Sequence, residues 1–297
     1  MIRENSPAPS DLSHALTRQA VIGLLLVLPA IFLVVSIVVV PTLYALLASL
    51  KNNGEWTLAN YLTLFTTPPY PNVIANTMWI SLIVTAATML LSIPLAMFLS
   101  VQPARSATLV LVLISASLWI SVLVKIYAWQ VLLARNGPLN ALLVEAGLVS
   151  APVPFLYSRA PVVLSMIQFL VPYATMMMYA SMRRVDWDLI TAARSLGGQI
   201  WFVAAEVYWP QIRFSVVTAA LVVFMLATSF YVAPALLGGP GDTMIGMQMH
   251  SDLVNRHDSG MAATAGVALS AILLGVSWVA LKMAGVSFTR AAGALSR

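Results

Sequence analysis

The stretch Asp188-Leu-Ile-Thr-Ala-Ala-Arg-Ser-Leu-Gly197, followed by Pro210, is a polar and charged segment between two apolar runs of membrane-spanning length. Asp188 opens this stretch, and a carboxylate at that place suits the positive end of a helix dipole. Gly197 closes it, because glycine readily takes the left-handed conformation that ends many helices. We therefore expect a short helix over 189–196, a second over 199–208, and a membrane span that begins at Pro210.

The composition places the chain among helical membrane proteins. Of its 297 residues 60% are hydrophobic and 8% are charged, and the mean hydropathy is +0.91, whereas soluble domains carry roughly 25% charged residues. The chain has no cysteine, which excludes disulfides, thiol chemistry and cysteine-ligated zinc. The net charge of +5 fits loop lysines and arginines on the cytoplasmic side and does not indicate a nucleic acid partner.

Apolar runs of about 20 residues mark membrane helices. The sequence predicts an all-α polytopic protein with six transmembrane helices, over 21–48, 73–101, 107–134, 160–182, 211–237 and 261–284. About twenty mostly polar residues precede the first run, which is too long for a signal peptide, so we expect it to remain as an anchor helix.

Lysine and arginine positions set the predicted orientation. With the N-terminus inside, ten of these residues face the cytoplasm and four face outward, as the positive-inside rule requires. The cytoplasmic residues are Arg3, Arg18, Arg105, Arg183, Arg184, Arg194, Arg213, Lys282, Arg290 and Arg297, and the external ones are Lys51, Arg135, Arg159 and Arg256. Both termini and the segment 183–210 are therefore expected in the cytoplasm of a bacterial cell, with the chain spanning the inner membrane several times.

Residues Ala192, Ala193, Gly197, Val207 and Pro210 fall on the spacing A-A-x-x-x-G, nine residues, [IV]-x-x-P. This spacing resembles the cytoplasmic "EAA" loop of binding-protein-dependent ABC importer permeases with the MetI-like fold, in which the loop docks onto the ATPase. The resemblance extends over residues 72–285. It departs at the first position of the loop, where Thr191 stands in place of the usual glutamate.

The resemblance implies a permease of a type I ABC importer that is not itself an enzyme and carries no cofactor or metal. ATP and magnesium would be bound by two ATP-binding subunits, and the other partners would be a second permease, expected to be a paralogue, a periplasmic solute-binding protein and membrane lipid. The implied ATPase-coupling residues are Asp188, Thr191, Ala192, Ala193, Arg194, Gly197, Val207 and Pro210.

The same resemblance divides the chain into three parts. Residues 1–71 hold the N-terminus, first span and an external loop, 72–285 form the permease core with its coupling loop 183–210, and 286–297 form a cytoplasmic tail. The stretches 127–140 and 229–240 are similar to segments of spermidine/putrescine-type permeases. The implied solute is a polyamine such as spermidine or putrescine, or a related small organic solute, and an iron complex, an opine or an amino-acid derivative is the alternative within the family.

Several residues are candidates for the translocation path. Lys125 is a cation inside an apolar run, and it either lines the path or extends its amine to the outer headgroups. Aromatic residues near the span ends either line the path or belong to the interfacial aromatic belt. The candidate path residues are Lys125, Tyr127, Trp129, Tyr173, Phe230 and Tyr231.

Other functions remain as alternatives. The 188–208 segment alone also fits an amphipathic helix on the lipid surface. A secondary transporter driven by an ion gradient would normally carry ionisable residues deep in its spans, and this chain has almost none. A non-transporting scaffold is a further alternative, and His250 and His257 lack the second ligand pair that a metal site needs. The absence of a G-x-x-x-x-G-K-[ST] motif argues against nucleotide binding by this chain.

Overall fold

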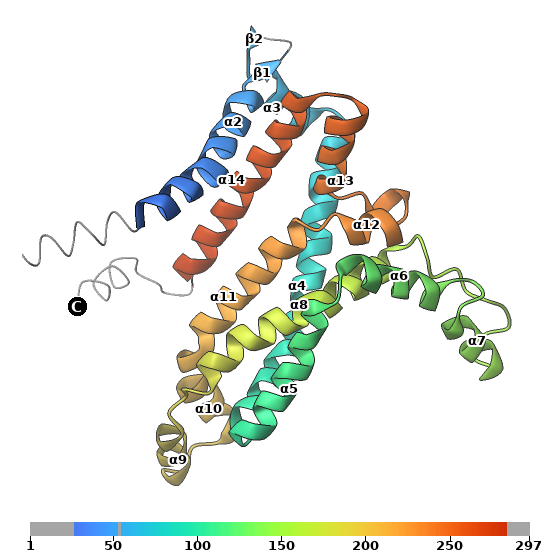
Figure 1. The fold of residues 1–297 in the computed structure, drawn as a ribbon. Helices are drawn as coiled ribbons and strands as arrows, with labels where there is room; N and C mark the ends of the chain where they lie inside the picture. The colour runs from blue at the N-terminus through green and yellow to red at the C-terminus, as the bar shows by residue number, and fades with distance from the viewer. Residues whose placement is uncertain (1–26, 53–54, 284–297) are drawn as a thin grey trace, which may run out of the picture.

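The computed structural model describes residues 27–52 and 55–283, and within these the chain is helical apart from one short hairpin (Figure 1). The helices are α2 (Val40–Ser49), α3 (Ala59–Thr66), α4 (Tyr70–Val101), α5 (Ala104–Ala116), α6 (Val122–Leu133), α7 (Pro138–Glu145), α8 (Arg159–Met182), α9 (Trp187–Ser195), α10 (Ile200–Val203), α11 (Trp209–Thr228), α12 (Val232–Leu237), α13 (Ile245–His250) and α14 (Ser259–Met283). Strands β1 (Lys51–Asn52) and β2 (Glu55–Trp56) pair antiparallel.

Short irregular turns join or interrupt these helices. The π-helical turns are η1 (Val35–Val39), η3 (Ala204–Tyr208) and η5 (Ser251–Asn255), and the 3₁₀ turns are η2 (Ser117–Trp119) and η4 (Pro240–Asp242). Residues Val27–Ser49 form one continuous helix that includes η1 and α2.

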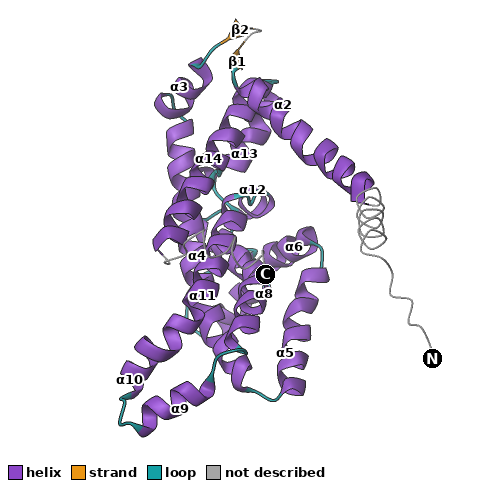
Figure 2. Cartoon of the chain, turned by 90° about the vertical axis from the view of Figure 1, so that its left-hand side faces the viewer, coloured by secondary structure: helices purple, strands orange, loops and turns teal. Residues whose placement is uncertain are grey.

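Helices α4, α8 and α11 pack against one another and form the centre of the molecule (Figure 1). Their shared core is apolar and includes Ile80, Met166 and Met178, each fully buried. Helix α2 packs along α14 at one side of this centre. The β-hairpin and α3 lie at one end of the molecule, and α9 and α10 lie at the opposite end (Figure 2).

Among the described residues, five helices are long and apolar enough to cross a membrane, and a bent pair of helices makes a sixth candidate. Helices α4, α8 and α14 confirm the spans predicted over 73–101, 160–182 and 261–284. The start of the span predicted at residue 21 and the C-terminal tail 286–297 lie outside the described residues. Which end faces the cytoplasm, and whether residues 1–71 form a separate part, stay predictions.

The prediction that the third span is a single helix over 107–134 is wrong. The chain turns by 90° between Ala104–Trp119 and Val122–Glu145. Ile120 and Ser121 leave the helical conformation for extended backbone, with ψ angles of 131° and 136°. No proline or glycine stands at this point. The bend is held by contacts of α6 with α8 and α12, which an apolar run does not reveal.

The fifth span also differs from its prediction over 211–237. Residues Ile200–Thr228 form one helix of 29 residues, so the expected separate helix over 199–208 is instead its first part. The π-turn η3 explains this continuity, because the Trp209 amide bonds to the Ala204 carbonyl five residues back and the helix can pass through Pro210. At its other end the helix stops at Thr228, and α12 follows separately.

Candidate functional site

Helix α9 begins with a side-chain cap. Asp186 is its N-cap, and the carboxylate accepts hydrogen bonds from the amides of Asp188 at 3.0 Å and Leu189 at 3.4 Å. The Asp186 amide itself donates to Gln211 Oε1 at 3.0 Å, which ties the start of α9 to α11. The rings of Trp187 and Tyr208 also pack together, with centroids 6.2 Å apart. The short helix is thus present and begins at Trp187, two residues before the predicted start, and contacts with Tyr208 and Gln211 hold it in place.

Gly197 supplies the predicted turn after α9. Its φ angle is +85°, in the left-handed region that glycine favours. The Gly198 amide donates to the Ala193 carbonyl at 3.1 Å and closes the turn. A Cβ on Gly198 would lie 2.7 Å from that carbonyl oxygen, so side chains are excluded there as well. The two glycines thus reverse the chain between α9 and α10.

We call α9, the turn 196–199 and α10 the α9–α10 element. It protrudes from one end of the molecule (Figure 2), and several of its apolar side chains are exposed. The exposed apolar residues are Leu189, Leu196, Ile200, Trp201 and Phe202, of which Leu196 and Trp201 are 89% and 81% exposed. Such a protruding apolar surface is typical of a region that binds another surface.

The predicted coupling residues are distributed over this element and the helix that follows. Asp188, Thr191, Ala192, Ala193 and Arg194 lie on α9, Gly197 lies in the turn, Val207 lies in η3 and Pro210 lies in α11. Thr191, which replaces the usual glutamate, donates its hydroxyl to the Trp187 carbonyl at 2.9 Å. This side chain is exposed and satisfied within its own helix, so the geometry of α9 does not need a carboxylate there.

Two interrupted helices meet on the surface of α8. One interruption separates α5 from α6 at Ile120–Ser121, and the other separates α11 from α12 at residues 229–231. Helices α6 and α12 contact each other and α8, and Gln130 Nε2 donates to the Leu236 carbonyl at 3.0 Å. We call residues 117–133 and 228–237 the broken-helix region. Non-helical backbone inside a membrane is tolerated where protein buries it or where it lines a cavity.

Lys125 lies inside the broken-helix region, where neighbouring side chains cover most of it. Its residue surface is 9% exposed, and its Nζ is 4.9 Å from the centre of the Phe169 ring. Nζ also donates to Ser117 Oγ at 3.4 Å. Whether Lys125 lines the path or extends its amine to the outer headgroups stays a prediction.

The structure brings four of the six predicted path residues together. Lys125, Trp129 and Phe230 line one small cavity, and Tyr173 joins them through Phe169, whose ring centroid is 5.8 Å from Tyr173 and 5.3 Å from Phe230. The other two lie elsewhere: Tyr127 is 65% exposed, and Tyr231 packs against His250. Whether any of them contacts a solute stays a prediction.

Sequence reasoning missed Phe169 and Gln168. Phe169 is the aromatic centre of this cluster, and Gln168 Oε1 accepts a hydrogen bond from Trp129 Nε1 at 2.7 Å. Gln168 is a lone amide in the apolar run 160–182, and that polarity was a usable signal.

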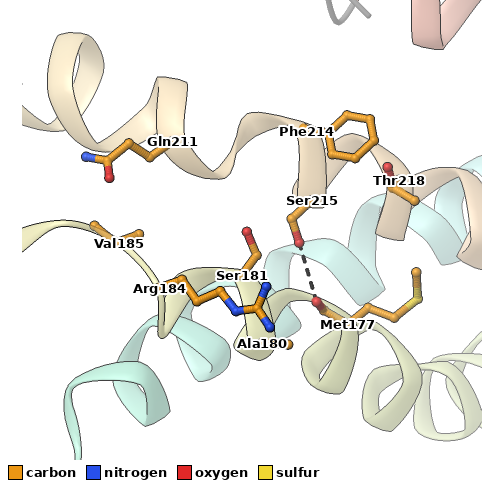
Figure 3. Close-up of a pocket in the computed structure, with 9 residues that line it drawn as sticks. All are labelled: Met177, Ala180, Ser181, Arg184, Val185, Gln211, Phe214, Ser215 and Thr218. Atoms are coloured by element: carbon orange, nitrogen blue, oxygen red, sulfur yellow. Dashed lines mark hydrogen bonds between the residues drawn. The ribbon is translucent and has the colours of Figure 1, made fainter. Parts of the chain in front are cut away.

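A cleft of about 480 Å³ separates the end of α8 from the start of α11, close to the α9–α10 element (Figure 3). Ser181 and Arg184 lie on the α8 side, and Gln211, Phe214 and Thr218 lie on the α11 side. The helices are linked across it by a hydrogen bond from Ser215 Oγ to the Met177 carbonyl at 3.4 Å. The cleft places polar groups where α9 meets the core.

At the opposite end, Asp252 is fully buried in η5. Its Oδ1 accepts from Gln248 Nε2 at 2.9 Å and lies 3.4 Å from Arg256 Nη1, which also donates to the Tyr70 hydroxyl at 3.2 Å. Burial raises the pKa of the Asp252 carboxyl above its usual range, against the opposing effects of Gln248 and Arg256. The segment between α12 and α14 thus contains an ordered pair of short helices, α13 and η5.

The fold defines the class of protein. A bacterial alginate ABC transporter, crystallised with an alginate-bound periplasmic protein, has a chain that superposes with a TM-score of 0.75 at 18% identity. The match covers 91% of this chain and 96% of that one. The fold is that of an ABC importer permease, an all-helical protein that crosses the membrane several times.

Sequence comparison narrows the class. The spermidine/putrescine transport system permease protein PotB of Escherichia coli is 27% identical over 218 residues, 73% of this chain and 79% of that protein. PotB of Haemophilus influenzae is 29% identical over 230 residues, 76% of this chain and 80% of that protein. No family model matches the sequence. In fold and in sequence the chain is therefore similar to permease subunits of binding-protein-dependent ABC importers, which are multi-pass proteins of the inner membrane.

Proposed function

We propose that this permease docks onto an ATP-binding subunit through the α9–α10 element and imports a small organic solute. Its partners would be a second permease, two ATP-binding subunits and a periplasmic solute-binding protein. The observation that supports this most directly is the exposed apolar surface of the α9–α10 element. Asp186 caps its first helix, Gly197 forms its turn, and the element is joined to the core.

The α9–α10 element is suited to transmit movement. It continues without interruption into the helix Ile200–Thr228, whose far end reaches the broken-helix region. Displacement of α9 by a closing ATPase would therefore tilt α11 relative to α8 and change the cleft between them. This rigid connection couples ATP hydrolysis to opening of the path.

The structure and the relatives say less about which solute is imported than about how the permease would move. The names of the two PotB relatives give spermidine and putrescine, and a polyamine is the first solute to test. The broken-helix region does not favour a polycation, however, because Lys125 would repel it.

The test is purification of the tagged permease from membranes of its host. We expect an ATP-binding subunit and a second permease to co-purify, and proteoliposomes of this complex to take up solute when ATP and the solute-binding protein are present. Purification of the permease without any ATPase, or uptake driven by an ion gradient without ATP, would contradict the proposal.

A further inference from the structure

The ammonium of Lys125 is poorly compensated by its surroundings. It lies in a membrane segment, nine-tenths of the residue is buried, and one long hydrogen bond to Ser117 and the face of Phe169 are its contacts among the described residues. A hydroxyl and an aromatic ring stabilise a cation but do not neutralise it. Intramembrane charges are costly and usually belong to functional sites.

No carboxylate stands near Lys125 in the described residues. The two salt bridges of the described chain join Arg159 to Asp242 and Arg256 to Asp252. Within the described candidate spans, the carboxylates are Glu145, at the end of α7, and Glu206, in η3 beside the α9–α10 element. Neither belongs to the broken-helix region. The missing negative charge must therefore come from outside these residues.

The cavity beside Lys125 is lined mainly by apolar side chains, and its few polar groups include the amide of Gln168. Trp129 Nε1 donates to Gln168 Oε1 at 2.7 Å, which fixes the Gln168 amide with its NH₂ group free to donate elsewhere. Lys125, Trp129 and Gln168 line the same cavity as the interruption of the fifth helix at Phe230. An ammonium and an amide donor beside aromatic rings are the groups that bind an anionic oxygen.

We propose that the imported solute carries an acidic group, a carboxylate or a phosphate-type anion, and that Lys125 binds this group as the solute passes the broken-helix region. This inference rests on the proposed transport function and specifies its solute class. Lys125 thereby determines specificity by attracting an acid and repelling a polyamine. In the described conformation Phe169 covers the ammonium, so the solute meets Lys125 when the region opens.

The experiment uses the complete importer in lipid nanodiscs with its solute-binding protein. Binding protein purified from host cells is denatured, and the released small molecules are separated by anion and cation exchange and analysed by mass spectrometry. Each fraction is then returned with refolded binding protein, and stimulated ATP hydrolysis is measured. We expect the stimulating molecule to contain a carboxylate, phosphate, phosphonate or sulfonate. Stimulation by a polyamine or by a neutral molecule would overturn the proposal.

Substitution of Lys125 tests the role of the residue. Lys125→Met keeps the length and apolar stem of the side chain, so the complex should assemble, while solute-stimulated ATP hydrolysis should fall at least about 10-fold. Lys125→Arg retains the charge and should stay within about 3-fold of the wild type. Equal activity of Lys125→Met and wild type would overturn the proposal.

Two further outcomes distinguish a contact between subunits from a failure of solute import. Loss of the second permease from the Lys125→Met complex on size exclusion would show that the lysine pairs with a carboxylate of that subunit, and the proposal would be wrong. A wild-type complex that contains the ATPase but responds to no fraction would contradict solute import itself, that is, the proposed function on which the inference rests.

Discussion

The α9–α10 element and the broken-helix region are both incomplete in a single chain, but in opposite ways. The element presents exposed apolar side chains such as Leu196 and Trp201, which lack a covering surface. The broken-helix region buries a cation, Lys125, which lacks a counter-charge in the described chain. Apolar surface is stabilised by a large protein partner, whereas a single buried charge is satisfied by a small polar one. The contrast supports the proposed protein docking at one site and the proposed solute passage at the other.

A charge placed in the docking contact should have the largest effect. Ala193 is half-buried on α9, and Ala193→Asp would put an unpaired carboxylate into a contact that the ATPase desolvates, at a cost of about 3–5 kcal/mol. We expect uptake and stimulated ATP hydrolysis to fall more than about 100-fold at normal membrane levels, measured in proteoliposomes and by immunoblot.

Thr191→Glu is the matched control for Ala193→Asp. It adds a carboxylate on the same helix, at the position where the family usually carries glutamate, and the Thr191 side chain is exposed. Uptake should therefore remain close to that of the wild type. Equal loss in both variants would show that any charge on α9 is harmful, and normal uptake with Ala193→Asp would show that the α9–α10 element only lies on the lipid surface.

A substitution in the turn should have a smaller effect. Gly197 has a φ of +85°, which a β-branched residue adopts at a cost of about 1–2 kcal/mol. Gly197→Val should displace α9 relative to α10 and reduce uptake about 10-fold, without loss of the external binding protein's affinity for its solute.

The control glycine for this turn is Gly275, which lies inside α14 with open space around its Cβ position and no positive φ. Gly275→Val should leave uptake within about 2-fold of the wild type, since valine is readily accommodated in a membrane helix. If both valine variants lose uptake to the same degree, backbone strain at Gly197 is not the cause.

These two regions also differ in how far the sequence predicts them. The geometry of the α9–α10 element is determined by nearby residues. An aspartate cap, two small residues and a glycine in one short stretch specify the conformation seen at Asp186 and Gly197. The prediction failed only after the turn, where the helix runs continuously through Pro210 because η3 adds a π-turn. A π-turn depends on backbone bonding and has no residue signature in this stretch.

For the broken-helix region, the sequence indicated candidate residues but did not predict the bend in the helix. Lys125, Trp129 and Phe230 were grouped as candidates and lie around one cavity. The bend at Ile120–Ser121 was missed because apolar residues continue through it. Its geometry depends on contacts between residues far apart in sequence, such as Gln130 with Leu236. Hydropathy shows that a segment is apolar enough to lie in the membrane, but it does not show where the segment bends.

That tertiary origin can be tested at Gln130. Gln130→Met fills the same volume but leaves the Leu236 carbonyl without the Nε2 donor at 3.0 Å. We expect the complex to lose about 1 kcal/mol of stability, seen as a lower Tm in detergent. Uptake should also slow modestly, since α6 and α12 are held together less firmly. An unchanged Tm would show that packing alone fixes the two interrupted helices.

The smallest expected effect is a pH dependence at Asp252, at the end of the molecule opposite the α9–α10 element. Burial raises the pKa of the Asp252 carboxyl and the charge of Asp258 adds to this rise, whereas Gln248, Tyr70 and Arg256 lower it. A raised pKa means that the folded protein favours the protonated carboxyl. The associated stability is complete below the pKa of the unfolded chain, about 3.9, and is lost as the pH rises through the higher folded pKa.

Tm measured in detergent between about pH 4.5 and 7.5 should therefore fall less steeply with rising pH in Asp252→Asn than in the wild type, because asparagine does not ionise. The comparison uses the slope rather than the Tm itself, since the substitution also removes the charge that faces Arg256 at 3.4 Å. Parallel slopes would show that the ion pair with Arg256 offsets burial, and η5 would then be held by that pair. A flatter slope for Asp252→Asn with unchanged uptake would show that Asp252 contributes to stability and not to transport. The proposed function would then depend on the α9–α10 element and the broken-helix region.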